Sequence, residues 1–147
     1  MEIKTKILSE EARLPTRGTE YSVGYDLYSI EDVDLSEHYI DDKPYLVRTG
    51  IAMEIPENHA GFVMPRSSHG FKHITQTNGV GLIDPDYRGE IKVPLKATDI
   101  MDVTMHITKG ERIGQLVVVP CEELDFVAVS ELTHSDRGTK GFGSTGF

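Results

Sequence analysis

The stretch Ile113-Gly114-Gln115-Leu116-Val117-Val118-Val119 is rich in β-branched residues and lies between the turn-forming residues Gly110 and Pro120. This composition is typical of a β-strand. Only residues 9–14 and the stretch after residue 67 can form even a short helix. The pattern therefore predicts an all-β fold, such as a sandwich, a barrel or a jelly roll. The further runs of the same kind are at residues 3–8, 25–29, 45–55, 60–64, 91–96, 103–107 and 126–129.

Length and charge limit the possible functions. The 147 residues fit one ordinary domain. A formal net charge of −9 argues against a general nucleic-acid-binding protein, because affinity for the phosphate backbone comes from clustered Lys and Arg. The single cysteine, Cys121, excludes an internal disulfide, and we expect it to be small and buried. With no signal-peptide core and no membrane-length apolar run, we expect a soluble, cytoplasmic protein without a membrane partner.

The last residues of the chain differ from the rest. Residues 133–147 are rich in glycine and contain few apolar side chains, so they bury too little surface to order themselves. They are either a frayed terminus or a flap that orders over an anion, since glycine lets backbone amides approach a phosphate and Arg137 supplies charge. We therefore expect one domain at residues 1–132 and a flexible C-terminal arm at residues 133–147.

The segment NGVGLIDPDYRGE, at residues 78–90, is the densest in polar groups that suit a binding site. A glycine-spaced apolar strand leads into Asp84, a turn and Tyr87. By itself the segment fits an ordinary β-hairpin with Asp84-Pro85-Asp86 as its turn. A hairpin also offers backbone donors and acceptors that can read a flat base, while Asn78 adds an amide and Asp84 can accept a proton from water.

Two other segments carry groups suited to phosphate. Arg66, Ser67 and Ser68 follow an apolar run, where a guanidinium, two hydroxyls and backbone amides can cradle a polyphosphate. A turn with a helix cap explains the same residues equally well. Gln115 interrupts an apolar run, so its half-buried amide needs partners, and a bound phosphate could be one. His69 and His73 have the i, i+4 spacing of a helical zinc motif, but no Glu lies between them and no third ligand is evident, so we interpret them as solvated or structural.

Taken in order, these segments resemble the five motifs of the trimeric dUTPase family. In this sequence the motifs are VGYDLYS (23–29), PRSS (65–68), NGVGLIDPDYRG (78–89), GERIGQ (110–115) and RGTKGFGSTG (137–146). Five matches in the right order, spread over most of the chain, are far more specific than any one. The departures are Val23 where the family usually has Ala, Ser68 where Gly is common, and a longer loop at residues 37–42. None of them removes a catalytic group.

The resemblance implies a fold, an assembly and an activity. The fold would be a distorted jelly-roll, or β-clip, subunit with one short helix. Three subunits would form a homotrimer with shared active sites, each closed by the C-terminal arm of a neighbour. The enzyme would hydrolyse dUTP to dUMP and pyrophosphate, which limits uracil in DNA and supplies dUMP for dTMP synthesis. A Mg2+ ion would be held mostly by the substrate phosphates and water, with no protein ligands.

The resemblance also implies a role for each site residue. Asp84 would be the general base for the water that attacks the α-phosphorus, and Asp26 would orient Arg66. Tyr87 would exclude a 2′-hydroxyl, and Phe142 would stack on the base. The residues implied to bind uracil and deoxyribose are Asn78, Gly81, Leu82, Ile83, Tyr87, Lys92 and Phe142. Those implied to bind the phosphates are Arg66, Ser67, Ser68, Gln115, Arg137, Gly143 and Ser144.

Two other functions compete with this interpretation. The related dCTP deaminases are expected to carry a catalytic Glu on the strand after the third motif, but residues 91–95 read IKVPL and contain no carboxylate. A non-catalytic nucleotide sensor or partner-binding scaffold would keep the fold alone. The intact Asp84, Tyr87, Arg137 and Phe142 argue against lost catalysis, although they leave a second, regulatory role open.

Overall fold

The structure is a computed structural model and describes residues 1–38, 43–98, 105–139 and 141. These residues form strands, one 3-10 turn and one short α-helix, so the all-β prediction is confirmed. The helices are η1 (Leu35–His38) and α1 (Ser67–Phe71). The strands are β1 (Thr5–Ile7), β2 (Thr16–Arg17), β3 (Tyr25–Tyr28), β4 (Val33–Asp34), β5 (Tyr45–Arg48), β6 (Ile51–Met53), β7 (His59–Met64), β8 (Ile74–Gln76), β9 (Gly81–Ile83), β10 (Lys92–Ala97), β11 (His106–Ile107) and β12 (Arg112–Pro120).

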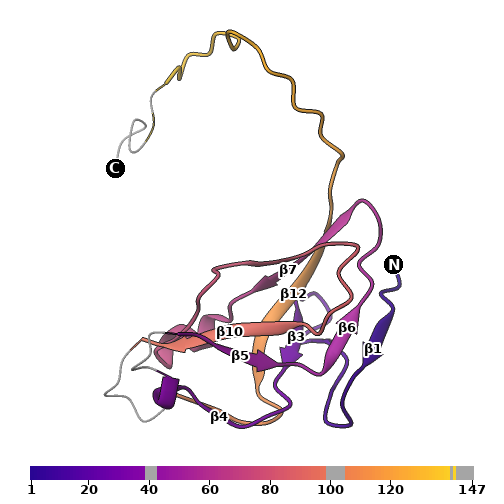
Figure 1. Cartoon of the computed structure of the whole chain (residues 1–147), viewed down its shortest axis with the longest axis vertical. Helices are drawn as coiled ribbons and strands as arrows, with labels where there is room; N and C mark the ends of the chain where they lie inside the picture. Colours follow the sequence, from indigo (N-terminus) through magenta and orange to yellow (C-terminus); the bar gives the residue numbers. More distant parts are fainter. Residues whose placement is uncertain (39–42, 99–104, 140, 142–147) are drawn as a thin grey trace.

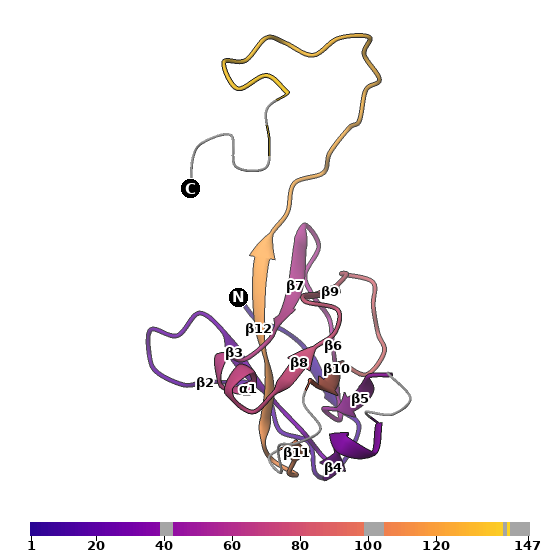
Figure 2. The same ribbon diagram turned by 90° about the vertical axis from the view of Figure 1, so that its left-hand side faces the viewer.

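Antiparallel sheets make up the body of the molecule (Figures 1 and 2). The largest has the strand order β2-β3-β12-β7-β9, and a second has the order β5-β10-β8. Two smaller pairs, β1-β6 and β4-β11, complete the described strands. Apart from the consecutive pair β2 and β3, neighbours in the large sheet come from distant parts of the chain, as expected for a jelly roll. No helix in the described part of the chain is long and apolar enough to cross a membrane.

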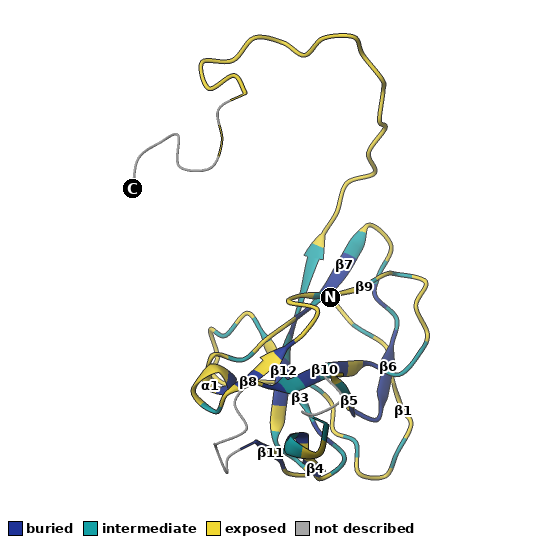
Figure 3. Cartoon of the chain, turned by 60° about the vertical axis from the view of Figure 1, so that its left-hand side comes forward, coloured by how far each residue is buried: buried dark blue, intermediate teal, exposed yellow. Residues whose placement is uncertain are grey.

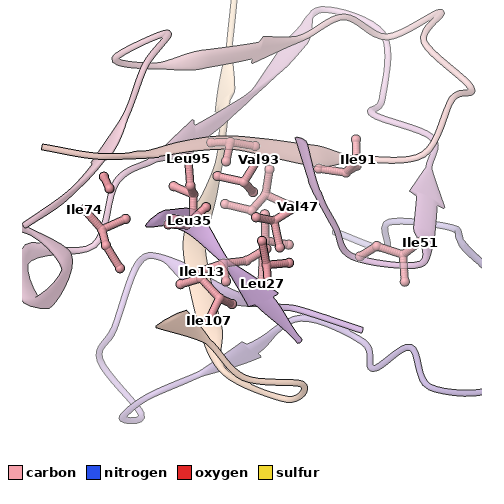
Figure 4. Packing of buried hydrophobic residues seen from close by; sticks show 14 of the residues in the cluster. Leu27, Leu35, Val47, Ile51, Ile74, Ile91, Val93, Leu95, Ile107 and Ile113 are labelled. Atoms are coloured by element: carbon pink, nitrogen blue, oxygen red, sulfur yellow. The ribbon is translucent and has the colours of Figure 1, made fainter. Parts of the chain in front are cut away.

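The hydrophobic core lies between the two larger sheets (Figure 4). Val93 and Leu95 of β10 face Leu27 of β3 and Ile113 of β12, and all four side chains are buried. Along β10 buried residues alternate with more exposed ones, as a strand requires when one face covers a core. This alternation points Lys92 to the opposite face, where it lines a cavity.

Three local predictions are wrong. Residues 9–14 form only a turn, closed by a hydrogen bond from Ala12 N to Ser9 O of 3.1 Å, and the following Pro15 disfavours helix at Leu14. Residues 126–129 form no strand, because no strand in the described part of the chain pairs with them. Cys121 is exposed rather than buried, because β12 ends at Pro120 and the chain leaves the core there.

After β12 the chain runs away from the body (Figures 1 and 3). All of residues 121–139 are exposed, including apolar side chains such as Phe126, which is 92% exposed, and Leu132, which is 89% exposed. Apolar side chains are therefore exposed along this segment instead of packing against the body. The longer loop predicted at residues 37–42 begins within η1, and its last four residues lie outside the described residues.

Candidate active site

A cavity of about 470 Å³ opens beside β9. It brings together Asp84 and every described residue that was predicted to bind uracil or deoxyribose. Gln76, Glu90 and the apolar side chains of Leu46, Val63, Ile91 and Pro94 complete the wall. The lining residues that were predicted are Asn78, Gly81, Leu82, Ile83, Asp84, Tyr87 and Lys92.

The cavity exists because the two arms of the expected hairpin do not pair. β9 pairs with β7, whereas β10 pairs with β5 and β8. The prediction of an ordinary paired hairpin is therefore wrong, although the turn itself is present, with Tyr87 N donating to Asp84 O at 3.2 Å. As the edge strand of its sheet, β9 has backbone donors and acceptors with no partner among the described strands. They are available to a flat ligand in the cavity.

Asp84 directly follows β9 and its side chain is exposed at the cavity wall. Its carboxylate has no hydrogen-bond or ion-pair partner within residues 1–38, 43–98, 105–139 and 141. A carboxylate that protein donors leave unpaired can accept a hydrogen bond from water. The position suits a general base.

Tyr87 is held by its hydroxyl, which donates to the backbone oxygen of Glu90 at 3.1 Å. The ring packs over Gly89, where a Cβ would overlap with the Tyr87 hydroxyl and ring. Glycine is therefore required at position 89 for Tyr87 to keep this place. The Glu90 carboxylate accepts from Gly50 N at 2.9 Å and pairs with Arg48 Nε at 3.1 Å, which anchors the end of the segment.

A second group of polar residues surrounds Asp26 at the other end of the large sheet. The Asp26 side chain is buried, and its carboxylate lies 3.5 Å from Arg66 Nε and 3.2 Å from Arg112 Nη1. Gln115 Nε2 donates to the same carboxylate at 3.3 Å, and Arg66 Nη1 donates to Arg112 O at 3.2 Å. Two guanidinium groups share one carboxylate, so a positive charge is left to attract an anion.

Ser67 and Ser68 begin α1, immediately after Arg66. Both serines are exposed, and no side chain among the residues that the structure describes caps the helix. The short helix predicted after residue 67 is thus present, and its first residues lie next to the Arg66 guanidinium. Hydroxyls and a guanidinium in this arrangement can bind phosphate oxygens.

Within one chain, Asp84 at the cavity and Arg66 in the group around Asp26 lie far apart. Ile83 is opposite Gly61, so Asp84 lies level with Ala60, and Arg66 is six residues further along the extended chain that includes β7. At about 3.3 Å per residue the two Cα atoms are about 20 Å apart. None of Asp26, Arg66, Ser67, Ser68 and Gln115 lines the cavity. The chain therefore does not bring the predicted base and the predicted phosphate-binding residues together.

The predicted residues of the C-terminal arm are only partly described. Arg137 is exposed and lies in a bend of the segment after β12, where Gly138 N donates to Ser135 O at 3.0 Å. Phe142, Gly143 and Ser144 lie outside the described residues.

Gln76, Glu90 and Arg112 are site residues that sequence reasoning missed. Gln76 and Glu90 line the cavity, and Arg112 shares the Asp26 carboxylate. Gln76 could have been found as a polar residue on the inward face of a strand, two positions after buried Ile74. Arg112 lies within the fourth motif, for which only Gln115 was predicted to bind phosphate.

His69 is buried beside the Asp26 group, in agreement with the structural rather than the solvated interpretation. Neither ring nitrogen has a hydrogen-bond partner among the residues described. Burial lowers the pKa of His69 below its ordinary value of 6.5, with further lowering by Arg66 and Lys72 and partial opposition from Glu111. The folded protein therefore favours the neutral imidazole.

This lowered pKa predicts that the protein loses stability as the pH falls below about 6.5. The unfolded chain then binds the His69 proton more readily than the folded chain, which lowers the free energy of unfolding by up to about 1.4 kcal/mol per pH unit. In His69→Leu this part of the pH dependence of the free energy of unfolding should disappear. Denaturant unfolding at pH 7.5 and pH 5.5 would measure it. Exposed His134→Leu is the control. An unchanged slope in His69→Leu would refute the assignment.

Comparison with known proteins identifies related sequences over most of the chain. A family model described as dUTPase matches residues 10–146. The deoxyuridine 5'-triphosphate nucleotidohydrolase of Nautilia profundicola is 42% identical over 147 residues, which covers 99% of each protein.

Solved structures give the same result. The dUTPase of Staphylococcus bacteriophage 80alpha, determined with dUPNHPP, has a TM-score of 0.84 at 31% identity and covers 99% of both chains. A mutant dUTPase from phage phi11 of S. aureus has a TM-score of 0.76 at 25% identity and covers 91% of this chain and 100% of its own. That structure is described as revealing the coordination of a structural Mg(II) ion. The likeness to dUTPase structures confirms the predicted jelly-roll fold.

Proposed function

The chain belongs to the dUTPase family and hydrolyses dUTP to dUMP, and we propose that its cavity binds the deoxyuridine while Asp84 activates the attacking water. The observation that carries this proposal is the gathering of Asp84, Asn78, Tyr87 and the open edge of β9 around one cavity. A dCTP deaminase activity is not supported, since β10 (Lys92–Ala97) carries no carboxylate.

The base and the sugar occupy the cavity beside β9. Uracil presents one N–H between two carbonyl groups, and this edge matches the backbone donors and acceptors of Gly81, Leu82 and Ile83, with Asn78 and Lys92 at the rim. Tyr87 lies beneath the deoxyribose. Its hydroxyl is bound to Glu90 O and cannot move aside freely, so a 2′-hydroxyl would collide with the ring.

Asp84 acts on the water. Its unpaired carboxylate accepts a proton from a water molecule as the water oxygen attacks the α-phosphorus, and the bond from that phosphorus to the bridging oxygen of pyrophosphate breaks. Pyrophosphate leaves on the side opposite the water. The products are dUMP, pyrophosphate and a proton, which Asp84 passes to solvent at its exposed position.

Arg66, Ser67, Ser68 and Gln115 bind the α- and β-phosphates. The buried Asp26 is a positioning residue, because it holds the guanidinium of Arg66 at 3.5 Å and accepts from Gln115 at 3.3 Å. Arg112 shares this carboxylate and adds positive charge near the phosphates. Local charge of this kind lets an acidic protein bind a highly anionic substrate.

The active site is shared between the subunits of a homotrimer. Asp84 and Arg66 are about 20 Å apart in one chain, too far for one α-phosphate to contact both. A neighbouring subunit that presents its Arg66 group to this cavity completes the site. The exposed apolar residues of the segment after β12, including Phe126 and Leu132, supply surface that such an assembly can cover.

The arm at residues 133–147 closes the site, in our proposal, as a part distinct from the domain at residues 1–132. Arg137, Gly143 and Ser144 bind the γ-phosphate, and Phe142 stacks on the uracil. The negative charge of the substrate then orders this segment, whose own composition is not sufficient to order it. The cytoplasmic location expected from the sequence is part of the same proposal.

Mg2+ is the proposed cofactor. The described residues contain no group of three or more His, Cys, Asp or Glu side chains that could hold a metal ion. Asp26 is already paired with two arginines, so its carboxylate is not free for a cation. This donor set fits an ion whose ligands are the substrate phosphates and water. When bound, the ion neutralises phosphate charge and helps to fix the triphosphate for in-line attack.

Gly89→Ala tests the proposed sugar site. A Cβ at this position displaces Tyr87 and breaks its bond to Glu90 O, so the preference for dUTP over UTP should fall about tenfold, because a displaced ring no longer blocks a 2′-hydroxyl. Pyrophosphate release from dUTP, UTP, dTTP and dCTP with magnesium would measure this preference. Gly70→Ala, where a Cβ meets no atom within 4 Å, is the control. An unchanged dUTP/UTP ratio in Gly89→Ala would remove Tyr87 from sugar selection.

A further inference from the structure

The side chain of Gln76 lines the cavity, although the function proposed above assigns it no role. It is 5% exposed and lies at the end of β8. Its Nε2 lies 2.9 Å from Val63 O, 2.9 Å from Asn78 Oδ1 and 3.3 Å from Gly79 O. Its Oε1 is buried and has no hydrogen-bond partner among the described residues.

These contacts determine the orientation of both amides. Two of the three groups around the Gln76 terminus are backbone carbonyl oxygens, which only accept hydrogen bonds. The Gln76 atom facing them must be the amino group, because a flipped amide would place Oε1 against two carbonyl oxygens. The Asn78 atom facing Gln76 must then be the acceptor Oδ1, so the Asn78 amino group points elsewhere.

The Asn78 amino group lies over β9. Its nitrogen is 3.2 Å from the position that a Cβ of Gly81 would occupy, and both residues line the cavity. Within the described ranges this nitrogen has no hydrogen-bond partner. Asn78 therefore offers an unused donor beside the backbone edge of β9, where the proposed function places the base.

We propose that Gln76 is a positioning residue for base selection, which holds the Asn78 amide so that its amino group donates to the 4-carbonyl oxygen of uracil. The inference rests on the proposed binding of uracil in this cavity. Cytosine carries an amino group at that position, so two donors would meet and one would stay unpaired. Without Gln76, the Asn78 amide can turn over and present Oδ1, an acceptor that suits cytosine.

The test replaces Gln76 and measures base preference. In Gln76→Leu the ratio of kcat/KM for dUTP to that for dCTP should fall about tenfold, as expected when one orienting hydrogen bond is lost. The loss for dUTP should be mainly in KM, since Gln76 does not touch the reacting phosphate. Gln76→Met, closer in length, provides a second variant if Gln76→Leu folds poorly. Thr75→Val, exposed on the other face of β8, is the control.

A double-mutant cycle separates positioning from a structural role. Asn78→Ala should lower the dUTP/dCTP ratio, and adding Gln76→Leu to Asn78→Ala should lower it no further, because Gln76 acts through Asn78. Independent, additive losses would overturn the inference. If Asn78→Ala lowers the ratio and neither Gln76 variant does, the inference is wrong and the base site stands. If Asn78→Ala leaves the ratio unchanged, the proposed base site is itself wrong.

Discussion

Asp84→Ala should lower kcat for dUTP by about 10³-fold while the protein still binds substrate, because a general base contributes to the transition state and little to ground-state binding. The structure supports this separation. The Asp84 carboxylate is exposed and unpaired in the described chain, so its removal leaves no buried partner unsatisfied. Single-turnover pyrophosphate release would give the rate, and titration with a non-hydrolysable imido analogue of dUTP would give the affinity.

Asp86→Ala is the matched control for this variant. Asp86 is an exposed carboxylate in the same turn, but it lines a different groove, with Pro85, Arg88 and Glu54. Asp86→Ala should keep kcat within about twofold of the parent, as most surface substitutions do. If Asp84→Ala lost affinity for the analogue in step with its rate, Asp84 would be a binding or structural residue. Equal effects of the two variants would also contradict the assignment.

The sequence alone predicted the fold class well, because alternation of apolar residues is a local property. The burial pattern of β10 and the short α1 follow directly from neighbouring side chains. Residues 126–129 have the same β-branched composition but form no strand, since a strand also needs a partner. Pairing depends on residues far apart in the chain, which composition does not reveal.

The same distinction applies to the site. The turn at Asp84 was visible in the sequence, but the divergence of its two arms was not, because it results from β9 pairing with β7 and β10 pairing with β5 and β8. Gln76 escaped notice for a similar reason. Its contact with Val63 depends on how β7 and β8 meet, and an isolated Gln in a strand gives only a weak signal.

The separation of Asp84 from Arg66 has the widest consequence for function. Asp84→Ala and Arg66→Ala should each be nearly inactive as pure proteins, the second because the α- and β-phosphates lose their guanidinium. In mixed assemblies of the proposed trimer, however, an Arg66→Ala chain supplies Asp84 and an Asp84→Ala chain supplies Arg66. If chains combine at random in equal amounts, about one quarter of the sites receive both intact residues, so activity should rise far above that of either variant.

The direct measurement is pyrophosphate release from dUTP after the two variants are unfolded together, refolded and shown by native mass spectrometry to have exchanged chains. We predict that the mixture recovers up to about one quarter of the parent activity, as random pairing across subunits requires. Activity no greater than the average of the two pure variants, in trimers that have demonstrably mixed, would contradict a site shared between subunits.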